Sequence, residues 1–166
     1  MLNEKFNAKS LTKAGIIGAI YVALTMALYP FSFGAVQVRV SEGLTLLPLL
    51  FPESIIGLTV GCLISNLFGN GVLDIVFGTL ATFLSAILTY FVGRLIKKPW
   101  LKILVGGFFP VIINAIIVPF TFLAITESVT VYLITAGQIF IGQALAVYLV
   151  GTPLYLAIKK GSKILP

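Results

Sequence analysis

The sequence contains no histidine and a single cysteine, Cys62, in 166 residues. The absence of histidine removes the side chain that most often serves as a general base or metal ligand near neutral pH. One cysteine excludes a disulfide within the chain, and its place beside Gly61 predicts a small core residue. The sequence also has no phosphate-binding glycine–lysine loop and no nucleophile paired with a base. We therefore expect a protein that is not an enzyme and holds no cofactor or metal of its own.

Charged residues are scarce as well, with 11 basic and five acidic residues against 59% hydrophobic ones, and the mean hydropathy is +1.13. A water-soluble domain of 17.8 kDa has too little interior to bury that much apolar surface. The sequence therefore predicts an all-α integral membrane protein that forms one domain over residues 1–166. The net charge is +6, but the cations cluster at the ends of apolar stretches rather than along one polar face. A lipid bilayer is thus the predicted surroundings, and nucleic acid is not a predicted partner.

Six apolar stretches are predicted to form a six-transmembrane-helix bundle. Pro30 stops the first stretch, while Pro48 and Pro52 leave the second short and broken. Polar and apolar side chains alternate over residues 31–41, which predicts an extended, strand-like loop. Pro153 is predicted to kink the last helix. The six predicted helices cover roughly residues 11–29, 42–51, 53–68, 72–96, 100–125 and 131–158.

The basic residues predict the orientation of this bundle. They cluster before the first stretch, over residues 94–102 and in the C-terminal tail, which all fall on one side of a six-helix bundle. By the positive-inside rule that side is cytoplasmic, so both termini are predicted to be cytoplasmic. An ionisable group near membrane depth is by default a candidate functional residue. Four such residues are predicted to share the outer face: Arg39, Glu42, Asp74 and Glu127.

The segment from Gln37 to Glu42 holds the densest polar chemistry in the chain. Arg39 and Glu42 either pair with each other as a structural clasp or face a polar ligand. Asp74 either stabilises the N-terminus of its helix or joins that site. Side-chain amides inside apolar helices either form hydrogen bonds between helices or contact the ligand. We expect Gln143 to lie too deep in the membrane to belong to the site. The predicted ligand-binding set is Gln37, Arg39, Glu42, Asn66, Asn70, Asp74, Asn114, Glu127 and Gln138.

Small residues recur every four positions along the first predicted helix. Side chains at that spacing form a shallow groove that lets a second helix approach closely. The groove either packs against this chain's own helices or docks a separate membrane subunit, and its place on the terminal helix favours docking. The predicted docking residues are Gly15, Ala19, Ala23 and Ala27.

Three segments carry a family resemblance: VQVRVSEGLTLLP at residues 36–48, GCLISNLFG at 61–69 and DIVFGTLAT at 74–82. They closely resemble the QueT family, which comprises substrate-binding S components of energy-coupling factor (ECF) transporters, a type of ABC importer. The likeness spans essentially the whole chain, with Gly43 standing where the family pattern has alanine. It implies a six-helix bundle in the bacterial cell membrane. It also implies that the small-residue groove docks a transmembrane T component, which carries two cytoplasmic ATPases that use ATP.

The same resemblance implies uptake of a queuosine precursor, chiefly 7-aminomethyl-7-deazaguanine. Such a ligand presents two adjacent N–H donors, a carbonyl acceptor and a cationic arm. A carboxylate such as Glu42 can accept both N–H groups, and a second acid, Asp74 or Glu127, can meet the ammonium group. Arg39, Asn66 or Gln138 can donate to the carbonyl. Two alternatives remain at this point. One is an S component for another vitamin or nucleobase, and the other is a structural membrane subunit without a solute ligand.

Overall fold

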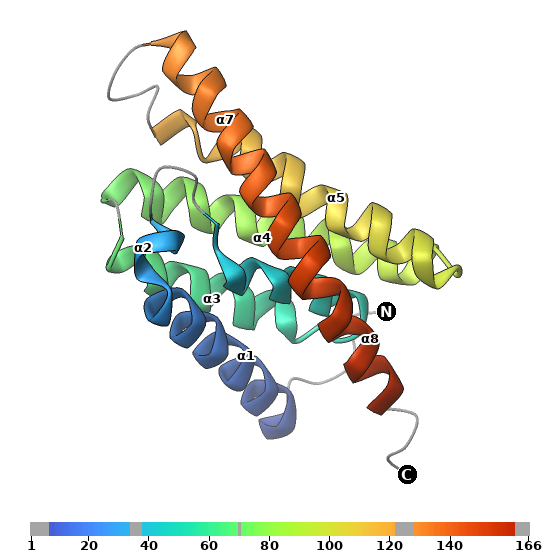
Figure 1. Ribbon diagram of the computed structural model, residues 1–166. Helices are drawn as coiled ribbons and strands as arrows, with labels where there is room; N and C mark the ends of the chain where they lie inside the picture. Colours follow the sequence, from blue (N-terminus) through green and yellow to red (C-terminus); the bar gives the residue numbers. More distant parts are fainter. Residues whose placement is uncertain (1–6, 34–37, 70, 122–127, 162–166) are drawn as a thin grey trace.

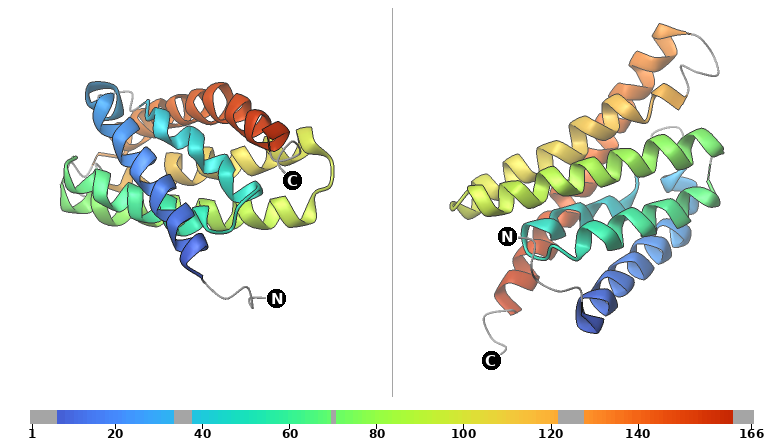
Figure 2. Two further views of the ribbon diagram at one scale, coloured as in Figure 1. Left: turned by 90° about the horizontal axis from the view of Figure 1, so that it is seen from below. Right: turned by 180° about the vertical axis from the view of Figure 1, so that it is seen from behind.

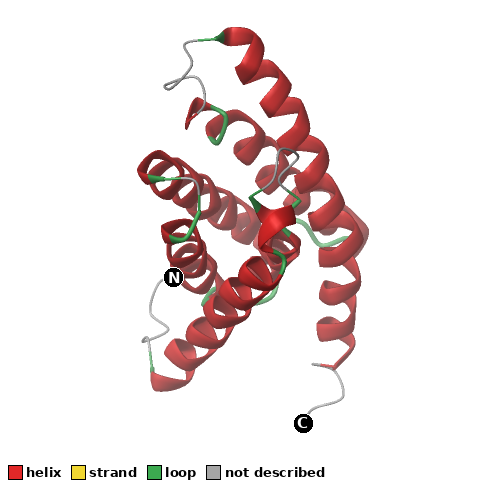
Figure 3. Cartoon of the chain, turned by 60° about the vertical axis from the view of Figure 1, so that its left-hand side comes forward, coloured by secondary structure: helices red, strands yellow, loops and turns green. Residues whose placement is uncertain are grey.

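The computed structural model describes residues 7–33, 38–69, 71–121 and 128–161, and within these ranges the chain is helical and has no strand (Figure 3). The all-α prediction is therefore confirmed for the described residues. In chain order the elements are α1 (Ala8–Ala27), α2 (Tyr29–Ser32), η1 (Val40–Leu49), α3 (Ser54–Leu67), α4 (Val72–Leu95), α5 (Pro99–Ile117), α7 (Val129–Ala144), η2 (Leu145–Gly151) and α8 (Thr152–Gly161).

The long helices are arranged around η1 (Figure 1). Helix α1 packs against α3, α3 against α4, α4 against α5, and α5 against α7, so neighbours along the chain are also neighbours in space. The α7–η2–α8 helix crosses the bundle obliquely, as the views from below and behind also show (Figure 2). Element η1 contacts α1, α3, α4, α5 and η2, and every residue from Ser41 to Leu49 is buried. Polar side chains on η1 therefore face the interior of the protein.

Among the described residues, four helices are long and apolar enough to cross a membrane: α1, α4, α5 and the continuous helix of residues 129–161. Their outward faces carry large apolar side chains, such as Phe91 and Leu149, which are exposed and suit a lipid surrounding. Helices η1 and α3 are apolar but shorter. The structure thus agrees with a membrane protein.

The second apolar stretch forms a ten-residue 3₁₀ helix, η1, with Pro48 near its end. A 3₁₀ helix rises about 2.0 Å per residue, so ten residues extend about 20 Å, roughly 5 Å farther than an α-helix of the same length. Runs this long are uncommon because 3₁₀ hydrogen bonds are poorly aligned. The burial of η1 on all sides supplies the stabilisation that its own hydrogen bonds lack.

The predicted strand-like loop over residues 31–41 is wrong at both of its described ends, which are helical, whereas Arg39 between them has an extended backbone with φ −87° and ψ 100°. Pro30 lies in the first turn of the short helix α2, which runs to Ser32, because a proline needs no partner for its missing N–H there. The 3₁₀ helix then begins at Val40. The end of the fifth predicted helix, residues 100–125, also differs from the prediction. The corresponding helix α5 ends at Ile117, two residues before Pro119, and not near residue 125.

Glycines allow α1 and α3 to pack backbone to backbone. A Cβ atom on Gly57 would lie 2.5 Å from the carbonyl oxygen of Ala14, and one on Gly61 would lie 2.9 Å from that of Gly18. Such close approach is typical of membrane helix pairs, where van der Waals contact replaces the hydrophobic effect as the driving force. The face of α1 that meets α3 is therefore fixed by Ala14 and Gly18.

We expect Gly57→Ala to lower the melting temperature of the purified protein, because the new methyl group meets main-chain atoms that cannot rotate away. Overpacking of this kind costs about 1–3 kcal/mol. Gly15→Ala is the matched control, since no atom lies within 4 Å of a Cβ at that position. Equal melting temperatures for the two variants in detergent would contradict this packing.

The C-terminal helix contains a π-helical segment, η2, and the predicted kink residue Pro153 lies two residues after its end, in the first turn of α8. Because proline lacks an N–H, a regular helical hydrogen-bond ladder cannot continue through it, and a wider turn is one way to absorb the loss. Here Gly151 meets Gly43 of η1, so closely that a Cβ on Gly151 would lie 2.5 Å from the Gly43 carbonyl oxygen. The two irregular helices, η1 and η2, are therefore in direct backbone contact.

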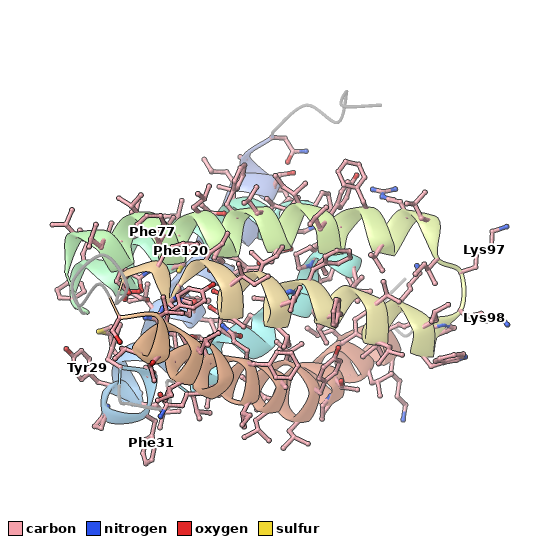
Figure 4. The ribbon with its side chains drawn as sticks, turned by 90° about the horizontal axis from the view of Figure 1, so that it is seen from above. Tyr29, Phe31, Phe77, Lys97, Lys98 and Phe120 are labelled. Carbon is pink, nitrogen blue, oxygen red and sulfur yellow. The ribbon has the colours of Figure 1, made fainter. Side chains whose placement is uncertain are left out.

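The two ends of the bundle differ in side chains (Figure 4). Lys97 and Lys98 lie at one end, in the turn between α4 and α5, and aromatic side chains lie at the other. Tyrosine is favoured at membrane–water interfaces and lysine on the cytoplasmic side. The labelled aromatic residues at the second end are Tyr29, Phe31, Phe77 and Phe120. The end of α3 and the start of α4 lie at this same end.

Candidate functional site

Arg39 is the centre of a buried polar cluster near the aromatic end of the bundle. Its Nη2 donates to Oδ2 of Asp74 at 3.1 Å, its Nη1 donates to Oδ1 of Asn66 at 2.8 Å, and its Nε donates to the carbonyl oxygen of Ser32 at 3.1 Å. The guanidinium also lies 4.6 Å from the centre of the Phe33 ring. We call Arg39, Asn66 and Asp74 the arginine clasp. It connects the segment before η1 to the end of α3 and the start of α4.

The arginine clasp is almost completely removed from solvent, with Arg39 7% exposed, Asp74 3% and Asn66 0%. Its two charges cancel, and Asn66 completes the arrangement by donating from Nδ2 to the carbonyl oxygen of Asp74 at 3.1 Å. Burial, the largest single effect, lowers the pKa of Arg39, but the neighbouring charges, led by that of Asp74, raise it above its ordinary value. Of the two alternatives for Arg39, the pairing with Glu42 is thus wrong, because its partner in the structure is Asp74.

Glu42 forms a second cluster, on the first turn of η1. It is 1% exposed, and its Oε1 accepts a short hydrogen bond from the hydroxyl of Tyr21 on α1. Ser41 beside it shares a hydrogen bond of 2.7 Å with Thr25, one turn along α1 from Tyr21. The second carboxylate oxygen, Oε2, is buried and has no hydrogen-bond partner within the described part of the chain. A buried acceptor left in this condition costs free energy unless something else binds there.

Gln143, on the last turn of α7, interacts with the same carboxylate through the N–H group of its side-chain amide. The amide oxygen, Oε1, is buried and has no hydrogen-bond partner among the described residues. The side chain as a whole is 6% exposed. Gln143, which was predicted to lie too deep for the site, is therefore close to Glu42, because η1 packs against η2 and η2 follows directly after α7.

The other predicted site residues are less closely associated. Asn114 is buried in α5, and its Nδ2 donates to the carbonyl oxygen of Pro110 in the same helix at 2.8 Å. Gln138 is half-buried on α7. Three predicted residues lie outside the described ranges: Gln37, Asn70 and Glu127.

The predicted docking stripe faces outward. Gly15, Ala19, Ala23 and Ala27 are all exposed, and no atom of the described residues comes within 4 Å of a Cβ on Gly15. The opposite face of α1 meets the rest of the bundle through Ala14, Gly18, Tyr21 and Thr25. The small residues that pack within the chain are thus a different set from the stripe, which leaves an open shallow face on α1.

Two residues near the polar clusters were not predicted to take part. Tyr21 is fully buried and holds Glu42, and the available signal was that Tyr21 and Thr25 are one turn apart on a face of an otherwise apolar helix. Cys62 is the buried core residue expected, but its sulfur also accepts hydrogen bonds from Asn66 at 3.4 Å and Thr82 at 3.2 Å. A thiol in that place ties the arginine clasp to the core between α3 and α4.

Comparisons with known proteins bear on the identity of this chain. The model of the family described as "QueT transporter" matches residues 11–160. A relative from Lactococcus lactis subsp. cremoris (strain MG1363), named "Queuosine precursor transporter QueT", is 36% identical over 81 residues. That alignment covers 48% of this chain and 48% of the relative, so the match spans about half the length of the curated protein. No solved structure shows significant similarity to the chain. Because the family match covers nearly the whole sequence, the chain belongs to the QueT transporter family, a family of transporters and not of enzymes.

Proposed function

We propose that this protein is the substrate-capture subunit, or S component, of an ECF-type importer and that it binds a queuosine precursor. Membership of the QueT family and the name of the Lactococcus relative support a precursor as the ligand. The observation that carries the proposal is the buried carboxylate of Glu42, which keeps one oxygen without a partner deep in a transporter. An ionisable residue in such a place marks a substrate pathway by default.

The chemistry of 7-aminomethyl-7-deazaguanine fits this arrangement. Its pyrimidinone edge offers N–H donors to the free oxygen of Glu42, and the cationic arm suits a site whose remaining charges, Arg39 and Asp74, cancel. The arginine clasp holds the segment that immediately precedes η1, and therefore the turn of η1 that carries Glu42, in a fixed position. A planar ring can also stack on an aromatic side chain of the same end of the bundle.

A ligand panel tests this proposal with the full chain in detergent. We expect 7-aminomethyl-7-deazaguanine to raise the melting temperature in a saturable way, because a ligand at about 100 times its Kd stabilises the folded state by about 2.7 kcal/mol. Guanine, adenine, thiamine and riboflavin are the comparison ligands. A shift with one of the vitamins instead would support an S component of different specificity. The absence of any saturable ligand would support a structural subunit and overturn the proposal.

We further propose that the protein assembles with a transmembrane T component and two ABC ATPases, and that the ATPases use ATP. The open small-residue stripe on α1 supports this arrangement, since it is exposed and apolar and the chain's own helices leave it uncovered. A shallow face of this type lets another membrane helix approach closely. The protein would then be a multi-pass protein of the bacterial cell membrane, with η1 and α3 completing six crossings and both termini in the cytoplasm.

We expect Ala23→Trp to weaken co-purification with the T component at least about tenfold, because the indole fills the shallow face and holds the partner helix away. Ligand binding by the isolated subunit should not change, since Ala23 points away from the bundle. Leu80→Trp is the matched control, because Leu80 is an exposed residue of α4 and the substitution adds an indole away from the stripe. Quantitative pull-down from membranes that contain the whole transporter measures the effect, and equal recovery of both variants would rule out this docking face.

A further inference from the structure

Two buried acceptor atoms inside the bundle have no hydrogen-bond donor among the described residues, and they define a candidate site. They are Oε2 of Glu42 on η1 and Oε1 of Gln143 on α7. The hydroxyls of Ser32, Ser65 and Thr79 are also without partners, but a hydroxyl can serve as either donor or acceptor. Carboxylate and amide oxygens only accept, so whatever satisfies Glu42 and Gln143 must bring N–H or O–H donors.

The surroundings hold these two side chains in place. Tyr21 donates to Oε1 of Glu42, and Oε2 has no hydrogen-bond partner among the described residues, although the amide N–H of Gln143 is directed at the same carboxylate. Gln143 comes just before the π-helical segment η2, and η2 rests on η1 through the contact of Gly151 with Gly43. Wider π turns of this kind often occur at functional sites. The backbone contact fixes how the helix that carries Gln143 lies against the helix that carries Glu42.

We propose that Glu42 Oε2 and Gln143 Oε1 together accept two adjacent N–H donors of the ligand, and that Gln143 is a specificity-determining residue. This inference rests on the proposed function and replaces the idea that both donors meet the two oxygens of Glu42. The ligand class is a heterocycle with an amino group next to a ring N–H, as in the aminopyrimidinone edge of a deazaguanine. The arginine clasp positions η1 and does not itself contact this edge, since the bonds of Asp74 and Asn66 with Arg39 are already made.

The inference predicts discrimination against a ligand that lacks one of the two donors. The probe pair is 7-aminomethyl-7-deazaguanine and its analogue without the exocyclic 2-amino group. We expect the analogue to bind about 10–100 times more weakly to the wild-type protein, because it leaves one acceptor buried and unpaired. Isothermal titration calorimetry with the full chain in nanodiscs measures both affinities and needs no substitution.

A variant then assigns the discrimination to Gln143. Gln143→Met keeps an unbranched side chain of similar size but removes the acceptor. We expect it to bind 7-aminomethyl-7-deazaguanine about tenfold more weakly and to lose most of its preference over the analogue. Leu145→Met, two residues further on an exposed face, is the matched control and should keep both affinities. A melting curve checks that each variant is folded.

The outcomes separate the two hypotheses. If the wild-type protein binds 7-aminomethyl-7-deazaguanine and Gln143→Met keeps the wild-type affinity and preference, the inference is overturned while the proposed function stands. Equal affinity of the wild-type protein for both probes overturns it too, even if Gln143→Met does not fold. If no saturable binding occurs at all, the proposed function fails and this inference fails with it. The inference is supported if Gln143→Met loses the preference for 7-aminomethyl-7-deazaguanine over the analogue and Leu145→Met keeps it.

Discussion

Arg39→Met is expected to destabilise the protein by about 3–5 kcal/mol, the usual cost of removing one partner from a buried ion pair. The substitution leaves the carboxylate of Asp74 only 3% exposed and without its cation, and it removes the donor to Asn66. The segment before η1 would then lose the hydrogen bonds that connect it to α3 and α4. Thermal or denaturant unfolding in a defined detergent measures the change.

A second substitution makes this prediction specific to the ion pair. The double variant Arg39→Met, Asp74→Asn removes both charges, so it should recover a large part of the lost stability, as expected for two residues that couple directly. Asp74→Asn alone should also destabilise, because Arg39 is then the unpaired buried charge. Additive effects of the two single substitutions would mean that Arg39 and Asp74 do not interact in the folded protein.

Glu42→Gln is expected to weaken binding of 7-aminomethyl-7-deazaguanine about 10- to 100-fold with little change in stability of the unliganded protein. The amide keeps the size of the side chain but replaces the charged acceptor, and hydrogen bonds to a charged group contribute about 1.5–3 kcal/mol. The unliganded protein should tolerate the change because the amide oxygen can still accept from Tyr21, and Oε2 has no hydrogen-bond partner among the described residues. Isothermal titration calorimetry gives the affinity.

Glu53→Gln is the matched control for Glu42→Gln. Glu53 makes the other salt bridge of the described residues, with Lys13 at 3.3 Å, just before α3 and away from the Glu42 cluster. The same chemical change there should leave ligand affinity unaltered. If Glu42→Gln binds as tightly as Glu53→Gln, the carboxylate of Glu42 does not contact the ligand.

These predictions depend on pairings that the sequence indicates only in part. Spacing along the chain made Arg39 and Glu42 natural partners, since they are three residues apart. In the structure, however, Arg39 lies just before η1 and its side chain donates hydrogen bonds to residues of α3 and α4. Glu42 lies on η1 itself and accepts a hydrogen bond from Tyr21 of α1. Sequence distance is a poor guide here because η1 is surrounded by helices from all parts of the chain.

The docking stripe illustrates the same division. Its four-residue period was visible in the sequence, and that period places the small residues on one face of α1 whatever the fold. Which face of the helix meets the bundle was not visible, because Ala14 and Gly18 provide a second set of small residues on the other side of α1. The close fit with Gly57 and Gly61 decides between the two faces.

The sequence by itself determined that this is a helical membrane protein of the QueT type, where its main apolar stretches lie and which few polar residues break them. Those properties follow from composition and local pattern, which lipid and backbone hydrogen bonding constrain strongly. Only the tertiary structure decided that η1 is a 3₁₀ helix, that Asp74 neutralises Arg39, and that Glu42 meets Tyr21 and Gln143. The reason is physical: buried polar groups take their partners from whichever helices the packing of the whole bundle brings beside them.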